Sequence, residues 1–427
     1  MSYSPIIVLF ILFALNVPVA YGLLVSALFY FTFINTTFPN DLILQRMVAT
    51  GESFTLLAVP FFVAAGSVMY RAGIAEKLLG MADALAGHMK GGLAQVNVVL
   101  SMLMAGASGS ANADAAMQSK IFVPEMTKRG YSAGFSCGVT ATSATISPII
   151  PPGIGLILYA FMANVSVGRM FFAGFLPGFI IMISLMVAVF IISHRRNYPR
   201  SRDKMVSIRV ILRQLKESVW ALFLPLGILL GLRMGIFTPT EGGAIAVFYA
   251  LFVGFFVYRK LRISMLPGIL LESVIGTGTV MFIISAASTF AFYMSWERIP
   301  HTASVWLLGL TEHPMLLLLL VNLFLLFIGM FLEGTAALII LTPLLVPTAV
   351  ALGIDPIHFG IIMCVNLVIG GVTPPVGTLM FITCSMARIS VGEFLRESWV
   401  LIIALIVALF IITYIPALSL WLPNLVF

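Results

Sequence analysis

The sequence predicts an all-α integral membrane protein built on an inverted structural repeat, and three observations support this fold class. Of its 427 residues, 61% are hydrophobic and 9% are charged, with a mean hydropathy of +1.11. Apolar runs such as 170–193 and 401–422 exceed the roughly 18 residues expected of a membrane-spanning helix. A pair of adjacent prolines occurs twice, at an offset of 223 positions (374 minus 151).

The N-terminal part begins with an apolar run at 5–33. This run has no basic leading region and no small-residue cleavage motif, so we interpret it as a retained span rather than a signal peptide. Two later segments, Arg71–Lys90 and Ser207–Lys216, are amphipathic and basic, which predicts helices lying in the cytoplasmic interface. An arm between moving and fixed parts and a passive surface helix are both open readings of these segments.

Two helical hairpins are predicted, one in each half of the chain. Gly92–Ala105 and Ala111–Val123 flank a break that begins at Gly106. Met315–Ile328 and Thr335–Val346 flank the matching break that begins at Gly329. The arms of the first hairpin, with 13 or 14 residues, are about 20 Å long, which is too short for a hydrocarbon core of about 30 Å. We therefore expect re-entrant hairpins that enter from opposite sides and meet near the midplane.

Each hairpin is followed by an interrupted span. Tyr131–Met162 is broken at Ser147–Gly153, and Ile357–Ala387 is broken at Gly370–Gly377. A proline pair stops a helix because it removes backbone donors and clashes with the preceding turn. Carbonyls freed at a helix C-terminus attract a cation, and N–H groups freed at an N-terminus attract an anion. Four converging breaks therefore predict a secondary-transporter site for a cation and an anionic solute together.

The net charge of +7 is explained by membrane topology rather than by a nucleic-acid partner. The loop 193–217 carries eight Lys or Arg residues and is assigned to the cytoplasm by the positive-inside rule. Alternating the spans from this loop leaves only Arg46, Arg169, Arg233 and Arg298 on the outer side. The whole chain, 1–427, is thus expected to be one polytopic unit in a lipid bilayer.

Small neutral oxygen donors gather at the breaks, which favours Na⁺ over a proton as the coupling ion because few acids lie at membrane depth. Asp114 and Glu333 lie beside the two hairpin tips. Each could cap a helix N-terminus or handle an ion directly, and both readings are open. The sequence shows no nucleophile–base motif and no zinc or phosphate motif, so we do not expect an enzyme.

The four break motifs, in this order, resemble those of the large membrane subunit of TRAP (tripartite ATP-independent periplasmic) transporters. They read Gly-Ala-Ser-Gly-Ser-Ala-Asn from Gly106, Ser-Pro-Ile-Ile-Pro-Pro-Gly from Ser147, Gly-Met-Phe-Leu-Glu-Gly-Thr from Gly329 and Gly-Gly-Val-Thr-Pro-Pro-Val-Gly from Gly370. The resemblance implies an ion-transporter-like fold of elevator type in the bacterial inner membrane. It also implies Na⁺-coupled import of an organic anion such as a C4-dicarboxylate or a sialic acid.

The resemblance further implies two protein partners, a periplasmic substrate-binding protein and a small four-helix membrane subunit, here a separate chain. By motif, Na⁺ would be held by Ser108, Ser110, Asn112, Ser147, Pro148, Gly329, Gly370, Thr373 and Val376. The substrate would lie near Thr142, Ser143, Thr335 and Thr378. Residues 91–165 and 314–388 would form the transport domain, and 1–90, 170–300 and 396–427 would form mainly scaffold and arm helices.

Three alternatives compete with this reading. The first is a Na⁺/carboxylate symporter of similar twin-hairpin plan that needs no binding protein. The second is a channel built from re-entrant loops, although an inverted repeat within one chain favours alternating access. The third, an intramembrane enzyme, has no visible nucleophile–base pair or metal set.

Overall fold

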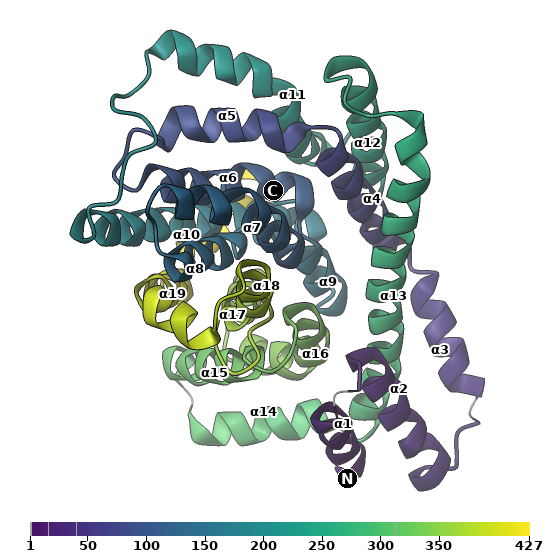
Figure 1. Cartoon of the computed structure of the whole chain (residues 1–427). Helices are drawn as coiled ribbons and strands as arrows, with labels where there is room; N and C mark the ends of the chain where they lie inside the picture. The colour runs from purple at the N-terminus through teal and green to yellow at the C-terminus, as the bar shows by residue number, and fades with distance from the viewer. Residues whose placement is uncertain (1, 16, 40, 312) are drawn as a thin grey trace.

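The computed structural model describes residues 2–15, 17–39, 41–311 and 313–427, and every regular element among them is a helix (Figure 1). Seven of the described helices are long and apolar enough to cross a membrane, or eight if one sharply bent pair forms a single span. The predicted all-α membrane architecture is therefore confirmed. The inverted relation of the two halves remains a prediction.

The first group of helices, called the outer group here, packs around the long helix α13. Its members are α1 (Ser4–Ala14), α2 (Val19–Phe29), α3 (Asp41–Gly51), α4 (Ala58–Arg71), α11 (Ile208–Arg233), α12 (Pro239–Phe252) and α13 (Leu266–Trp296), with short turns η1 (Tyr30–Ile34), η2 (Phe54–Leu57), η3 (Val253–Val257) and η4 (Ile263–Met265). Helix α13 contacts α2, α3 and α4, and α4 also packs along α12. In Figure 1, α2, α3, α4, α12 and α13 stand along one side of the molecule, and α11 runs along its top.

The second group, called the core group, contains the predicted breaks. It consists of α6 (Gly92–Ser108), α7 (Ala111–Lys128), α8 (Ala133–Ala144), α9 (Ile154–Met162), α15 (Pro314–Gly329), α16 (Gly334–Ala351), α17 (Pro356–Gly370) and α18 (Thr378–Ala387). All four breaks fall within the predicted segments, although α6 continues through Ser108 and so shortens the first break, and both proline pairs fall outside helices. The halves interlock, because α7 packs on α18 and α9 packs on α16.

The hairpin arms are longer than predicted, and here the expected ranges of 12 to 14 residues are wrong. The helices α6, α7, α15 and α16 contain 16 to 18 residues, about 24 to 27 Å at 1.5 Å per residue. Pro124 lies inside α7, and Pro343 and Pro347 lie inside α16. These single prolines do not end their helices. As a result, α16 by itself is long and apolar enough to be a candidate membrane span.

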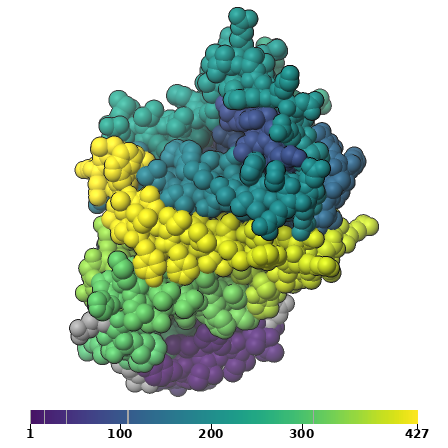
Figure 2. Space-filling model, turned by 90° about the vertical axis from the view of Figure 1, so that its left-hand side faces the viewer, coloured from purple at the N-terminus to yellow at the C-terminus, as the bar shows by residue number. Residues whose placement is uncertain are grey.

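The remaining helices join and cover the two groups. They are α5 (Ile74–Ala86), α10 (Val167–Arg195), α14 (Ile299–Leu310), α19 (Val391–Tyr414) and α20 (Ala417–Val426). Helix α5 lies between α6 and α11, while α19 contacts α8, α10 and α17. Figure 2 shows the C-terminal residues as a yellow band across one face of the molecule.

The predicted interfacial helix at Ser207–Lys216 is not separate from its neighbour. It forms the first turns of α11, which continues without interruption to Arg233. The basic residues and aliphatic residues of this segment are all good or acceptable helix formers, and no Gly or Pro follows until Pro225. The chain therefore has no local signal that would end the amphipathic segment before the apolar part begins.

Residues assigned to the cytoplasmic side come together at one end of the core group. Lys90 donates to Asn197 at 2.7 Å, and the Tyr131 hydroxyl donates to the Pro199 carbonyl at 2.8 Å. Arg196 pairs with Glu397 at the same end. Part of the loop 193–217 thus packs at the open end of the first hairpin, and its cytoplasmic location remains a prediction.

Candidate functional site

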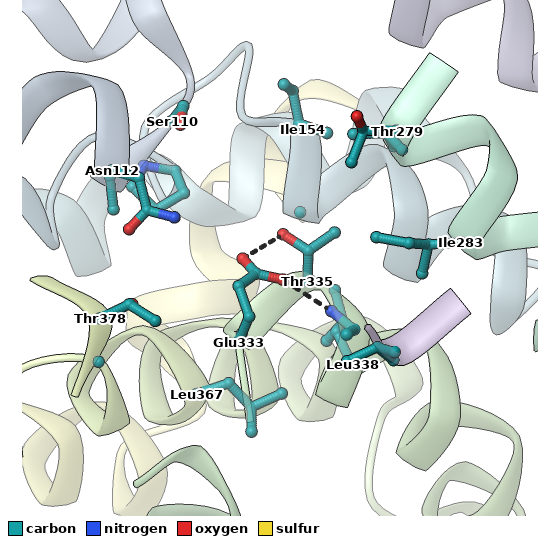
Figure 3. Close-up of a pocket in the computed structure, with 18 of the residues that line it drawn as sticks. Ser110, Asn112, Ile154, Thr279, Ile283, Glu333, Thr335, Leu338, Leu367 and Thr378 are labelled. Atoms are coloured by element: carbon teal, nitrogen blue, oxygen red, sulfur yellow. Dashed lines mark hydrogen bonds between the residues drawn. The ribbon is translucent and has the colours of Figure 1, made fainter. Parts of the chain in front are cut away.

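A cavity of about 740 Å³ lies where the core group meets the outer group. The core group contributes residues at its four breaks, and the outer group contributes residues of α2 and α13 such as Tyr21, Thr279 and Ile283. Figure 3 shows Ser110 and Asn112 across the cavity from Glu333 and Thr335, with Thr279 and Ile283 on the α13 side. Segments far apart in the sequence therefore form one chamber.

Four helices begin at the wall of this cavity. The first residues of α7, α9, α16 and α18 are Ala111, Ile154, Gly334 and Thr378, and all four line the cavity. The N-terminus of a helix carries a partial positive charge and unpaired N–H groups. The four helices therefore direct their positive ends toward the same space, which favours an anion there.

The four N-termini are capped differently. The Ser110 hydroxyl caps α7 by accepting from the Ala113 N–H at 3.4 Å. Glu333 caps α16 by accepting from the Ala336 N–H at 3.0 Å and from the Thr335 hydroxyl at 2.9 Å (Figure 3). No side chain caps α9 or α18.

The start of α9 has no side-chain cap. Ile154 and Gly155 line the cavity, and their backbone N–H groups have no acceptor among the described residues. The turn before them requires glycine, because a Cβ on Gly153 would lie 2.0 Å from the carbonyl oxygen of Pro148. The Pro-Pro-Gly sequence thus holds two free donors at the cavity wall.

Asp114 lies behind the first hairpin tip and is only 1% exposed. One carboxylate oxygen accepts from the Ser147 hydroxyl and from the Gln118 amide, both at 2.9 Å. The other oxygen is buried and has no hydrogen-bond partner among the described residues. Ser110 rather than Asp114 is the N-cap residue of α7, and Asp114 lies in the first turn of that helix, where an acid still favours the helix dipole. Capping is confirmed for Glu333.

In the second half, the C-terminal ends of α15 and α17 meet through two glycines, Gly329 and Gly370. A Cβ on Gly370 would lie 2.5 Å from the Cα of Gly329, so both helix ends need the absence of a side chain. The Thr373 hydroxyl donates to the Gly370 carbonyl at 2.8 Å, and the Val376 N–H donates to the Met330 carbonyl at 3.1 Å. The carbonyls of Gly370 and Met330 thus each accept a hydrogen bond from the segment that follows α17.

Asn366, one turn before Gly370, supplies a further buried oxygen. Its amide nitrogen donates to the side-chain oxygen of Asn322 at 2.7 Å, while its own side-chain oxygen has no partner in the described part of the chain. An unsatisfied oxygen this deeply buried is costly unless a donor or cation reaches it. Nothing in the sequence around Asn366 separates it from an ordinary helix-packing amide.

The residues predicted to hold ions and substrate separate into two sets. Ser110, Asn112, Pro148, Thr335 and Thr378 line the cavity. The others lie behind its wall or at the breaks, namely Thr142, Ser143, Ser147, Gly329, Gly370, Thr373 and Val376. The Thr142 hydroxyl donates to the Gly138 carbonyl within α8, and the Ser143 hydroxyl donates to the Asn97 side chain and so joins α8 to α6, each at 2.7 Å. The side chain of Ser108 lies outside what the structure describes.

Comparison with known proteins identifies related chains. A family model described as "Tripartite ATP-independent periplasmic transporter, DctM component" matches residues 6–418. A protein of Pseudomonas aeruginosa named C4-dicarboxylate TRAP transporter large permease protein DctM is 41% identical over 89% of this chain and 88% of its own length. A Vibrio cholerae protein named sialic acid TRAP transporter large permease protein SiaM is 38% identical over 97% of this chain and 96% of its own.

A solved structure shows that the fold is shared more widely. The crystal structure of the Alcanivorax borkumensis YdaH transporter superposes with a TM-score of 0.63 and covers 97% of this chain and 98% of its own. The sequence identity is 14%, so this likeness concerns the fold alone.

Proposed function

This chain belongs to the DctM component family of tripartite ATP-independent periplasmic transporters, and from that premise we propose that it carries a small organic anion through the cavity together with Na⁺. Its role is that of a transporter permease component rather than an enzyme. C4-dicarboxylates and sialic acids, named for two relatives, are the substrate classes to test first.

The observation that carries the proposal is the set of four helix N-termini at one cavity. No Lys, Arg or His side chain lines the cavity in the described ranges, so helix ends and free backbone N–H groups supply the positive potential. The uncapped start of α9 is the strongest candidate for contact with a substrate carboxylate, and the Asn112 amide lies in the same wall. Backbone N–H groups recognise an anion without the cost of a buried lysine or arginine.

Na⁺ fits two places beside the cavity. In the first half, the unpartnered oxygen of Asp114 adjoins Ser147, one of the residues expected to hold Na⁺. In the second half, the unpartnered oxygen of Asn366 lies one turn from the carbonyls at Gly370. Both sets consist of oxygen donors, which hard cations prefer. The donor chemistry thus supports a coupled cation in each half.

We further propose that the core group moves against the outer group, as in an elevator. The cavity lies between the groups, so a displacement of one group would carry its contents across the membrane. Residues 91–165 and 314–388 would form the centre of the moving part. Because α10 and α19 pack against core helices of both halves, we propose that they move with that part rather than stay with the scaffold.

The proposed setting is the bacterial inner membrane, with a periplasmic binding protein and a small membrane subunit as partners. The direct test is uptake of radiolabelled succinate or sialic acid into proteoliposomes that hold this chain with its small subunit. Uptake should saturate, require an inward Na⁺ gradient and require the loaded binding protein. Ohmic current would instead support a channel, and equal uptake without the binding protein would support an independent symporter.

A further inference from the structure

Glu333 is the only charged side chain that lines the cavity in the described part of the chain. It lies at the second hairpin tip, with its carboxylate group at the start of α16 (Figure 3). A carboxylate in this position is unexpected for an anion carrier, because like charges repel strongly in a poorly hydrated chamber.

Helix capping alone does not explain the choice of glutamate. At the offset of 223 positions, Glu333 corresponds to Ser110, which caps α7 with a neutral hydroxyl. Serine, asparagine and aspartate are the preferred N-cap residues, and glutamate is not among them. The second tip therefore carries a negative charge that its structural role does not require.

The carboxylate still has capacity to bind a cation. Each of its oxygens accepts one hydrogen bond, from Thr335 to one and from Ala336 to the other. An ionised carboxylate offers about four acceptor sites, so about two remain. The two bonds fix the orientation of the carboxylate, and the neutral hydroxyls of Thr335 and Thr378 in the same wall are suitable further ligands.

We propose that Glu333 binds a Na⁺ ion inside the cavity, between itself and the substrate anion, in addition to ions held behind the wall. This inference rests on the proposed function and deepens it. The cation neutralises the repulsion between the two carboxylates, so the anion binds tightly only when this Na⁺ is present. The free N–H groups at α9 then take one side of the substrate, and the cation at α16 takes the other.

The experiment compares Glu333→Gln and Glu333→Ser with Glu333→Asp in proteoliposomes, and measures the number of Na⁺ ions per anion from reversal potentials. Gln and Ser remove the charge, and Ser copies the neutral cap of the first tip. Both should lower the stoichiometry by one Na⁺ per anion, whereas Asp should keep it. Glu241→Gln is the matched control, because Glu241 belongs to an exposed capping box at the start of α12.

Binding of the same anion to purified protein at several Na⁺ concentrations tests variants that no longer transport. The slope of log affinity against log Na⁺ concentration should fall by one in Glu333→Gln. An unchanged slope and stoichiometry in both neutral variants would overturn the inference. The inference would also fail if these variants transported one proton fewer, rather than one Na⁺ fewer, per anion. Wild-type protein without any Na⁺-driven uptake would instead contradict the proposed function itself.

Discussion

The two hairpin tips differ in where they place their acidic residue. In the first half the tip residue Ser110 is neutral, and the carboxylate of Asp114 is buried behind it. In the second half the tip residue Glu333 is charged, and the buried group with an unpartnered oxygen is the neutral Asn366. The acid thus lies behind the tip in the first half and at the tip in the second.

This difference suggests a division of labour between two halves of similar backbone. The first half offers the cavity a neutral surface with free N–H groups at α9, which suits an anion. The second half offers a carboxylate, which suits a cation. Under our proposal, the two breaks have similar geometry, and different residues at matched positions select different ligands.

The largest effect is expected where the second half tolerates no side chain. Gly370→Ala places a Cβ 2.5 Å from the backbone of Gly329, and backbone atoms cannot move aside as a flexible side chain can. Overpacking of this kind typically costs about 1–3 kcal/mol, so transport should fall about 100-fold or be lost. The measurement is uptake per folded protein in proteoliposomes.

Gly309→Ala in α14 is the control for that substitution, because a Cβ there meets no atom within 4 Å. It should transport like the wild type. Normal uptake by Gly370→Ala would show that the glycine contact is not needed and that the two halves are less tightly closed than the structure indicates.

A smaller effect is expected from the buried acid of the first half. Asp114→Asn keeps the shape of the side chain but removes a charge that is hydrogen-bonded to Ser147 and Gln118. Hydrogen bonds to charged groups contribute about 1.5–3 kcal/mol, so the Na⁺ concentration for half-maximal uptake should rise about tenfold or more. This concentration is measured from uptake rates recorded over a range of Na⁺ concentrations.

The control for the buried acid lies on the same helix. Glu125→Gln removes a carboxylate that pairs with Arg129 at the exposed end of α7, and it should leave Na⁺ activation unchanged. If both substitutions shift the curve equally, the effect of Asp114 comes from the general charge of α7 and not from an ion site.

The sequence predicts the breaks well, because Pro-Pro and Gly act locally on the backbone. The pair Pro151–Pro152 lies in the non-helical segment between α8 and α9. The pair Pro374–Pro375 lies in the corresponding segment between α17 and α18. The lengths of the arms are less predictable, since Pro124 and Pro347 lie within helices that neighbouring helices support. Tertiary packing there outweighs the local preference of proline.

The site is predictable only in part, for the same reason. Ser110, Asn112 and Thr335 lie at tips that the sequence identifies, and they line the cavity. Thr279 and Tyr21 come from α13 and α2, and their approach depends on contacts between distant segments that no local pattern reveals. Thr142 carries a hydroxyl like the others, yet it bonds within its own helix.

The smallest effect is expected at Thr373, whose hydroxyl donates to the Gly370 carbonyl at 2.8 Å. Thr373→Ala frees that carbonyl and removes one ordinary hydrogen bond, worth about 1 kcal/mol. The Na⁺ concentration for half-maximal uptake should therefore rise about fivefold, with protein assembly unchanged. Thr373→Ser keeps the hydroxyl and should behave as wild type; an equal shift in both variants would assign the effect to the lost methyl group.

The central claim, that one cavity takes an anion with Na⁺ and opens to each side in turn, is tested most directly by labelling Asn112→Cys with a membrane-impermeant maleimide. The background would lack the native Cys137, Cys364 and Cys384, which are all buried. We predict labelling from either side of proteoliposomes, and protection only when Na⁺ and the transported anion are both present. Labelling from one side alone, or no protection by Na⁺ and anion together, would contradict the account.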